Sequence, residues 1–535
     1  MSIERSKSKD HSSLSPLSKA GGTVSNDLPP LRSFGQSEDM GPEPSGLRNL
    51  HRRNDADTIP VNEPTQTRSE ANVIVNTTTI PVEPEPANNQ GPNNKAERKA
   101  KQTKNDQALL TSDRWLARNG HTFTYVGLFL FSIMVLFRPY EIVPGLGFLA
   151  STAFYFALAT LAIYFPSQIA TEGTLTTMST EVKALLALTA LSLLTMPIAR
   201  SPGMAWDTFN DSFSKSVIIF IVLVNVVRTR KRLMGMMWLS FGIGIYLSIS
   251  ALQLYMSGKF TVEEYRVGVE IGGMFGNPNE MAMHFVMMTP LAFAMGLAVK
   301  GKIKRLVYFG MGGLLIAANM VTFSRGGFLG LVACMVFFAF KVGRKYRLNV
   351  AIASILISGI AMVAAPGNYG LRMLSIFIPG LDSVGSSNQR QELLWRSLLV
   401  SARNPWGIGI GNFPIVGIRD LQSHNAFTQV SAELGILGLV AYMIFMISPF
   451  RKLSAIERKH FDRDEFDWFY YVSIGLQASI VGYWVSSFFA SVAYNWFIYY
   501  LIAYAVAFRR IYNIERPADE AETAPVTGQQ PILAT

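Results

Sequence analysis

Long apolar runs recur along this chain and constrain its fold more than any other feature. By the criterion that about twenty apolar residues cross a bilayer, we count roughly twelve runs; several are short, and one or two re-entrant segments are the alternative. They cover residues 122–137, 146–165, 182–199, 213–227, 233–256, 279–299, 305–323, 326–340, 348–366, 430–450, 468–490 and 494–508. Because backbone polar groups inside a bilayer must bond within their own segment, each run predicts a helix. We therefore predict an all-α integral membrane protein with about twelve transmembrane helices.

The composition agrees with a membrane protein and argues against other classes. Of the 535 residues, 49% are hydrophobic and 16% are charged, which is too apolar for an ordinary soluble domain. The net charge of +11 would suit a nucleic-acid binder only if the basic residues clustered on a soluble domain, and they lie between apolar runs. The single cysteine, Cys334, excludes an intramolecular disulfide and a Cys-based zinc site. We expect no nucleic-acid partner and a core position for Cys334.

Basic residues in the short loops predict the orientation of the chain. They gather at 228–232, 300–305, 341–347, 451–463 and 509–510, which all fall on one side if every run crosses. The positive-inside rule makes that side the cytoplasm. Both termini are then cytoplasmic, and segments 257–278 and 367–429 lie on the outer side.

Three parts differ in composition. Residues 1–110 are rich in Ser, Pro, Asn, Thr, Glu and Lys and lack an apolar period, which predicts a disordered cytoplasmic tail without a signal peptide. A basic stretch at 96–104 indicates a solvated linker or a contact with anionic membrane lipids. Residues 111–515 form the predicted membrane domain, and 516–535 form a short polar tail.

The predicted outer loop, 367–429, draws its positive charge from arginine alone. Its basic residues are Arg372, Arg390, Arg396, Arg403 and Arg419. A guanidinium group has a planar fork that matches phosphate oxygens, so this set indicates phosphate recognition. An ordinary basic loop is the alternative, because long loops escape the charge rule.

A helix within this loop is predicted from Ser386, its N-cap, to Arg403. Arg390 lies near its start, where an anion would meet both a guanidinium and free backbone amides. Arg396 follows Glu392 at the spacing of an i, i+4 ion pair, so we interpret it as structural.

Glycines and one histidine follow that helix. Gly407, Gly409 and Gly411 provide backbone that approaches a ligand closely, so Gly409 and Gly411 are predicted to bind substrate. His424 is the only histidine of the loop, and imidazole accepts protons near neutral pH. It is the candidate base, with a hydrogen-bonding or capping role as the alternative.

Two further sites lie outside this loop. Arg325 stands in a turn between apolar runs, where a charge is costly unless it is paired or used; snorkelling to lipid phosphate is the other interpretation. Asn277 and Pro278 predict a helix start, with Asn279 as a residue that secondarily lines a substrate site. His284, one turn further, is predicted to be a buried core histidine.

These residues resemble the bacterial O-antigen ligase and polymerase superfamily over about 270–445. Ser324-Arg325-Gly326-Gly327-Phe328-Leu329 is similar to its R-x3-L motif. His424-Asn425, nine residues and Gly435-x-x-Gly438 is similar to its H-[N/S/Q]-x9-G-x-x-G motif. Arg390, Trp395 and the glycines at 407–411 resemble the region that precedes the family's histidine.

The resemblance implies an inverting, metal-independent glycosyl transfer without a cofactor at the periplasmic face of the bacterial inner (cytoplasmic) membrane. The implied donor is a glycan on undecaprenyl diphosphate, and the acceptor is a sugar hydroxyl on lipid A core or on another lipid-linked glycan. His424 would act as the base while Arg325 and Arg390 neutralise the leaving diphosphate. Asn425 would orient the imidazole or bind substrate, and Glu433 is a weaker candidate.

Two alternatives to a ligase stay open. A polymerase of lipid-linked repeat units needs the same base and the same arginines. A secondary transporter of an anionic solute would use 276–278 as a broken helix and Arg325 as an anion site.

Overall fold

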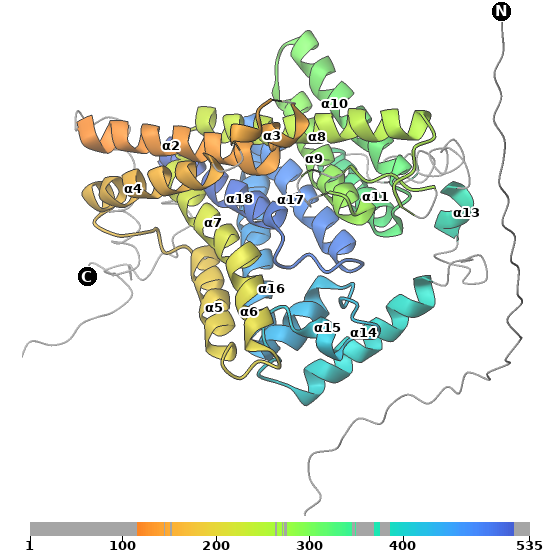
Figure 1. Ribbon diagram of the computed structural model, residues 1–535. Helices are drawn as coiled ribbons and strands as arrows, with labels where there is room; N and C mark the ends of the chain where they lie inside the picture. The colour runs from red at the N-terminus through yellow and green to blue at the C-terminus, as the bar shows by residue number, and fades with distance from the viewer. Residues whose placement is uncertain are drawn as a thin grey trace, which may run out of the picture. The chain divides into compact units, whose positions relative to one another are not determined.

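In the computed structural model, helices occupy the predicted apolar runs that lie within the described residues (Figure 1). The structure describes residues 115–143, 145–149, 152–262, 265–269, 271, 275–344, 348, 352, 369–374 and 386–517. These residues belong to one structural unit, Ala87–Thr535. The predicted N-terminal tail, nearly all of the predicted run 348–366 and almost all of the C-terminal tail lie outside the described residues.

The regular elements of the described residues are all helical. They are α2 (Trp115–Leu136), α3 (Pro139–Ile142), η1 (Gly147–Leu149), α4 (Thr152–Glu172), α5 (Thr180–Thr195), α6 (Pro202–Thr208), η2 (Phe209–Phe213), α7 (Ser214–Val226), α8 (Arg230–Met256), α9 (Pro278–Ala298), α10 (Lys302–Val321), α11 (Arg325–Val342), α13 (Tyr369–Leu374), α14 (Ser386–Arg403), α15 (Phe413–Val416), α16 (Ala426–Asp462), α17 (Trp468–Ser487) and α18 (Trp496–Glu515). No β-strand occurs in these ranges, where a single isolated bridge joins Val262 and Arg266. The predicted all-α class is confirmed.

In the part of the chain that the structure describes, seven helical segments are long and apolar enough to cross a membrane. They are His121–Glu141, Gly147–Glu172, Pro202–Val226, Arg230–Met256, Pro278–Ala298, Arg325–Val342 and Ala426–Asp462. Four further helices coincide with predicted runs but are not among the seven: α5, α10, α17 and α18. Helix α5 is short, and α10 has three basic residues in its first turn. Helices α17 and α18 carry many aromatic and hydroxyl side chains. The count of about twelve crossings and the outer position of 367–429 remain predictions.

Helix α9 lies at the centre of the bundle, in contact with α8, α10, α11 and α17. Its sequence is apolar on all sides, as expected of a helix that is surrounded by other helices. His284 on α9 is buried, with Nε2 3.3 Å from the carbonyl oxygen of Ser240. Cys334 is fully buried among apolar side chains. The predicted core positions of both residues are confirmed.

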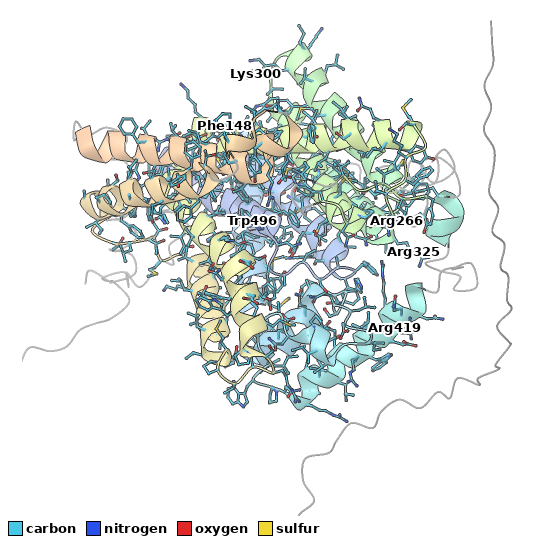
Figure 2. All side chains as sticks on the ribbon, viewed as in Figure 1. Phe148, Arg266, Lys300, Arg325, Arg419 and Trp496 are labelled. Carbon is cyan, nitrogen blue, oxygen red and sulfur yellow. The ribbon has the colours of Figure 1, made fainter. Side chains whose placement is uncertain are left out.

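The two ends of α9 separate the predicted site from a basic loop. Asn277 caps its first turn by accepting a hydrogen bond from the Asn279 amide at 2.9 Å, and Pro278 is its first residue. At 1.5 Å per residue, the 21-residue helix is about 31 Å long. Lys300 follows the far end, whereas Arg325 lies near the first turn (Figure 2).

Helix α16 consists of two helical parts that join at Gly435. This residue has φ 72° and ψ −172°, so the chain changes direction there. The Ile436 amide donates to the carbonyl oxygen of Pro405 at 2.9 Å. A Cβ atom at position 435 would overlap with that same carbonyl oxygen. Both the positive φ and the close approach therefore require glycine.

We expect Gly435→Ala to destabilise the fold by at least about 2 kcal/mol, because it combines a left-handed alanine with an overlap against backbone. A thermal unfolding scan of the detergent-solubilised protein measures the change. Gly313→Ala is the matched control, since Gly313 lies within α10 and a Cβ atom there meets open space. Equal melting temperatures for the two variants would contradict the assignment.

Candidate functional site

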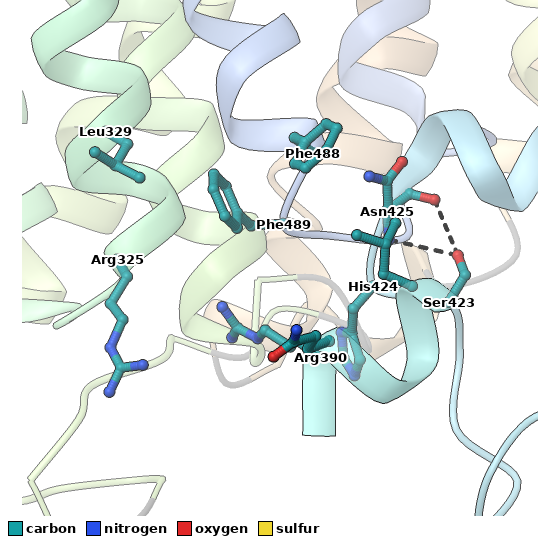
Figure 3. A pocket seen from close by; sticks show the side chains of 10 residues that line it. Arg325, Leu329, Arg390, Ser423, His424, Asn425, Phe488 and Phe489 are labelled. Atoms are coloured by element: carbon teal, nitrogen blue, oxygen red, sulfur yellow. Dashed lines mark hydrogen bonds between the residues drawn. The ribbon is translucent and has the colours of Figure 1, made fainter. Parts of the chain in front are cut away.

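Four segments that are distant in the sequence surround a cavity of about 250 Å³ (Figure 3). It is lined by Arg325 and Leu329 of α11, by Arg390, Gln391 and Leu394 of α14, by Ser423, His424 and Asn425 before α16, and by Phe488 and Phe489 between α17 and α18. The cavity brings together the three predicted catalytic residues, Arg325, Arg390 and His424. It also includes Asn425, which is one of the predicted substrate-binding residues.

Arg325 is placed by the start of α11. Ser324 caps this helix, and its Oγ accepts a hydrogen bond from the Gly327 amide at 3.1 Å. Arg325 is the first helical residue and is only 8% exposed. Leu329 follows one helical turn later, and residues at this spacing share a face. The R-x3-L spacing thus directs both side chains to the cavity.

Asn279 of α9 stabilises the start of α11 through hydrogen bonds. Its Oδ1 accepts hydrogen bonds from Ser324 Oγ at 2.8 Å and from an Arg266 guanidinium nitrogen at 2.9 Å. Arg266 also donates from Nε to the carbonyl oxygen of Thr322 at 3.1 Å. Asn279 is not among the residues that line the cavity. Its contacts fix the turn before Arg325, so the predicted role in substrate binding gains no support from them.

Arg390 lies near the start of α14, a helix that covers the predicted range Ser386–Arg403. In Figure 3 its side chain lies between Arg325 and His424. Two guanidinium groups therefore line one partly apolar cavity. Such an arrangement favours an anion with several oxygen acceptors.

His424 stands directly before the cap of α16. Its φ is 52°, in the left-handed region. Its amide donates to Ser491 Oγ at 2.8 Å. The next residue, Asn425, caps α16: its Oδ1 accepts from the amides of Phe427 and Thr428 at 2.9 and 3.1 Å. The imidazole is thus held at the junction of loop and helix.

The side-chain nitrogen of Asn425 is a second polar group at this position. Asn425 is 2% exposed, and within the described part of the chain its side-chain nitrogen has no hydrogen-bond partner. A buried donor without a partner is costly. This nitrogen suits an acceptor atom of a ligand in the cavity, whereas the oxygen of the same amide is occupied by the helix cap.

Burial, followed by the positive charge of Arg390, lowers the pKa of His424 below its ordinary value of 6.5. Both causes disfavour the charged imidazolium. At neutral pH the imidazole is therefore neutral, which is the form that accepts a proton.

This shift predicts the pH dependence of any reaction that uses His424 as a base. Activity is lost as pH falls through the pKa, so the lowered pKa extends activity to lower pH. Removing one cause with Arg390→Gln raises the pKa, and we expect the acid limb of kcat/KM to move to higher pH. The exposed Arg403 provides the control, because Arg403→Gln should leave this limb in place. An acid limb that is identical in both variants would contradict the coupling.

The glycine-rich loop packs against protein. Gly407, Gly409 and Gly411 have φ values of 86°, 99° and 71°. Cβ atoms there would overlap with the backbone of Glu433, with Ala199 and with Thr208, respectively. The predicted close approach of backbone is therefore present, but Gly409 and Gly411 are not among the residues that line the cavity. No contact in the structure supports their predicted role in substrate binding, which stays a prediction.

Two other residues of the loop region are held by backbone atoms. Glu433 is fully buried, and its Oε1 accepts a hydrogen bond from the Phe413 amide at 3.3 Å. Arg396 donates from Nε to the carbonyl oxygen of Val416 at 2.8 Å. Within the described ranges it forms no ion pair with Glu392, so the predicted partner is wrong. The four-residue spacing on α14 would permit an ion pair between Glu392 and Arg396, but the Arg396 side chain points toward α15. These contacts favour structural roles for both residues.

The wall of the cavity between α17 and α18 was not predicted from the sequence. Phe488 and Phe489 line it, and Ser491 bonds the His424 amide. In the sequence these residues end an apolar run, and nothing in that pattern separates them from residues that face lipid. Arg266 was missed for a similar reason, because a lone arginine in a loop carries no local signal.

The lining residues limit the chemistry of the cavity. Among the described residues that line it there is no Asp or Glu, so none of these residues offers a carboxylate nucleophile. Across the described residues, no group of three or more His, Cys, Asp or Glu side chains is placed to hold a metal ion. The described lining contains a proton acceptor, His424, and the guanidinium groups of Arg325 and Arg390.

Comparison with known proteins identifies one family. Residues 310–443 match the model of the family described as O-antigen ligase. This segment contains α11, α14 and His424, and it ends before α17. A comparison with curated proteins finds no match. The resemblance inferred from the motifs is confirmed over this segment, and together with the apolar helices it makes the chain a multi-pass membrane protein.

Proposed function

We propose, from the O-antigen ligase match of residues 310–443, that this membrane protein is a glycosyltransferase that moves a glycan from undecaprenyl diphosphate to an acceptor sugar hydroxyl. The family supports a membrane enzyme that processes glycans.

One observation carries the proposal: a single cavity is lined by His424, Arg390 and Arg325, which come from three separate segments. A transfer from a lipid diphosphate needs a base for the acceptor hydroxyl and cations for the leaving group. The neutral imidazole of His424 meets the first need. The two guanidinium groups meet the second.

The reaction is a direct displacement at the anomeric carbon. His424 takes the proton of the acceptor hydroxyl while the hydroxyl oxygen forms a bond to that carbon. The bond between the carbon and the diphosphate oxygen breaks, and Arg325 and Arg390 stabilise the negative charge that develops on the diphosphate. The proton on His424 then passes to solvent, which restores the base.

This scheme inverts the anomeric configuration, because attack and departure occur on opposite faces of the sugar. A retaining reaction through a glycosyl-enzyme ordinarily uses a nucleophilic carboxylate, and the described part of the cavity lining has no such group. The two arginines can neutralise the diphosphate in place of a divalent metal ion, so we propose metal-independent transfer without a cofactor.

The proposed location is the bacterial inner (cytoplasmic) membrane, with both termini in the cytoplasm. The basic loops support this orientation through the positive-inside rule. The cavity then faces the periplasm, where α14 and the start of α16 cover a donor whose lipid remains in the bilayer.

The acceptor separates the ligase from the alternative polymerase. The test uses the full chain in lipid nanodiscs with undecaprenyl-diphosphate glycan and two acceptors, lipid A core and a second lipid-linked glycan. Glycan transfer to lipid A core supports the ligase. Extension of the lipid-linked glycan alone supports the polymerase. If neither product forms and vesicles with the protein instead transport an anionic solute, the enzyme assignment is wrong.

A further inference from the structure

The connection between α17 and α18, residues 488–495, forms a wall of the cavity outside the family match. Phe488 and Phe489 line the cavity from this connection. The match to the O-antigen ligase model ends at residue 443. Any function of the connection is therefore specified by sequence that the match does not cover.

Ser491 of the connection contacts the backbone on both sides of the base. Its Oγ accepts a hydrogen bond from the His424 amide at 2.8 Å and lies 3.2 Å from Ser423 Oγ. Because Ser423 Oγ donates to the carbonyl oxygen of Asn425 at 2.9 Å, the hydroxyl hydrogen of Ser491 is the one that remains for the contact between the two serines. Ser491 thus acts as acceptor and donor at once.

The backbone of His424 needs such support. Its φ of 52° lies in a region that a residue with a side chain adopts at a cost, and the conformation persists only where its surroundings hold it. The cap formed by Asn425 fixes the helix side of His424. On the loop side, Ser491 is the group that bonds its amide.

The connection is itself held on several sides. Tyr483 Oη donates to the carbonyl oxygen of Val492 at 3.2 Å, and Tyr499 Oη donates to the carbonyl oxygen of Ala493 at 2.8 Å. The Ala493 amide donates to Gln429 Oε1 on α16 at 3.4 Å. Ser491 therefore belongs to a segment that is fixed by hydrogen bonds, and its own bond to the His424 amide restrains the backbone of His424.

We propose that Ser491 is a positioning residue that holds His424 in the left-handed conformation from which its imidazole faces the cavity. The inference rests on the proposed function, in which His424 is the base. The hydroxyl touches the backbone of His424 and not the reacting atoms, so its effect on catalysis passes through the placement of the imidazole.

Loss of this hydroxyl should change both the rate and its pH dependence. The charged groups that line the cavity with His424 are Arg390 from α14 and Arg325 from α11, whereas the connection contributes none from 488 to 491. If the backbone relaxes, the imidazole moves away from Arg390 and from its buried position. The acid limb of the rate profile then moves toward the ordinary value of 6.5, which is a shift to higher pH.

The test compares Ser491→Ala with Ser491→Thr and with Ser487→Ala in the full chain in nanodiscs. Ser487 is a matched control because it is buried nearby and its Oγ bonds the carbonyl oxygen of Trp484 in its own helix. We expect Ser491→Ala to lower kcat by roughly 10- to 100-fold with an unchanged donor KM and a raised acid limb. Ser491→Thr and Ser487→Ala should stay near the wild type. Should Ser491→Ala not fold, Ser491→Cys keeps the size with a weak acceptor and should show the same change in kcat.

Two outcomes separate this inference from the proposed function. If His424→Ala removes transfer while Ser491→Ala or Ser491→Cys retains the wild-type kcat and acid limb, Ser491 is not a positioning residue and the function stands. If His424→Ala itself transfers glycan at the wild-type rate, the proposed function fails, and the role of Ser491 fails with it.

Discussion

We expect His424→Ala to lower the rate of glycan transfer by about 10²- to 10⁴-fold, the usual contribution of a general base. The diphosphate sites on Arg325 and Arg390 remain in this variant, so the donor KM should stay within a small factor of the wild type. A single-turnover assay with labelled lipid-linked donor measures the chemical step separately from product release.

A second measurement distinguishes a lost base from a damaged fold. Added imidazole can enter the space that the truncated side chain leaves, so it should restore part of the transfer in His424→Ala and none in Arg325→Ala. Retention of more than half of the wild-type rate in folded His424→Ala would show that the base lies elsewhere.

Arg325→Ala and Arg390→Ala should each lower kcat by about 10²- to 10³-fold, as removal of one group that stabilises developing charge does in other enzymes. Both should also raise the donor KM, because the diphosphate is charged before transfer. Replacement by lysine keeps the charge but loses the planar fork, so we expect an intermediate rate. Arg403→Ala, at the exposed end of the same helix α14, is the control and should be fully active.

The double variant reports whether the two arginines act on one ligand. If both contact the same diphosphate, their effects on kcat should not simply multiply. Effects that multiply without any interaction would indicate separate ligands, and the assignment of one shared leaving group would then be wrong.

The helical class was predictable because each apolar run requires a helix, whatever its neighbours are. The count of about twelve crossings stays a prediction. Helices α17 and α18 coincide with two of the predicted runs but are rich in Tyr, Trp and Ser, and they are not among the seven candidate spans. Contacts of these helices with the rest of the bundle, for example Tyr442 Oη of α16 with Tyr483 Oη of α17 at 3.0 Å, have no local signature in the sequence.

The polar part of the site was predictable from residue chemistry and spacing. Arg325 stood out because a charge is unusual beside apolar runs. Arg390 stood out at a helix start in a loop whose basic residues are all arginine, and His424 as the only histidine of that loop; the cavity unites the three. The close backbone approach at the glycines of 407–411 was predictable, but the group that they approach was not. Gly409 packs against Ala199 and Gly411 against Thr208, which lie some two hundred residues earlier. For the same reason, no sequence pattern linked Ser491 to His424.

The most direct test of the central claim is transfer by the purified full chain in nanodiscs, in a buffer that contains EDTA. The substrates are undecaprenyl-diphosphate glycan and an acceptor, and NMR of the product gives the configuration of the new glycosidic bond. We expect transfer that survives EDTA, inverts the anomeric centre and disappears in His424→Ala. Transfer with retained configuration, or equal transfer by His424→Ala, would contradict this expectation.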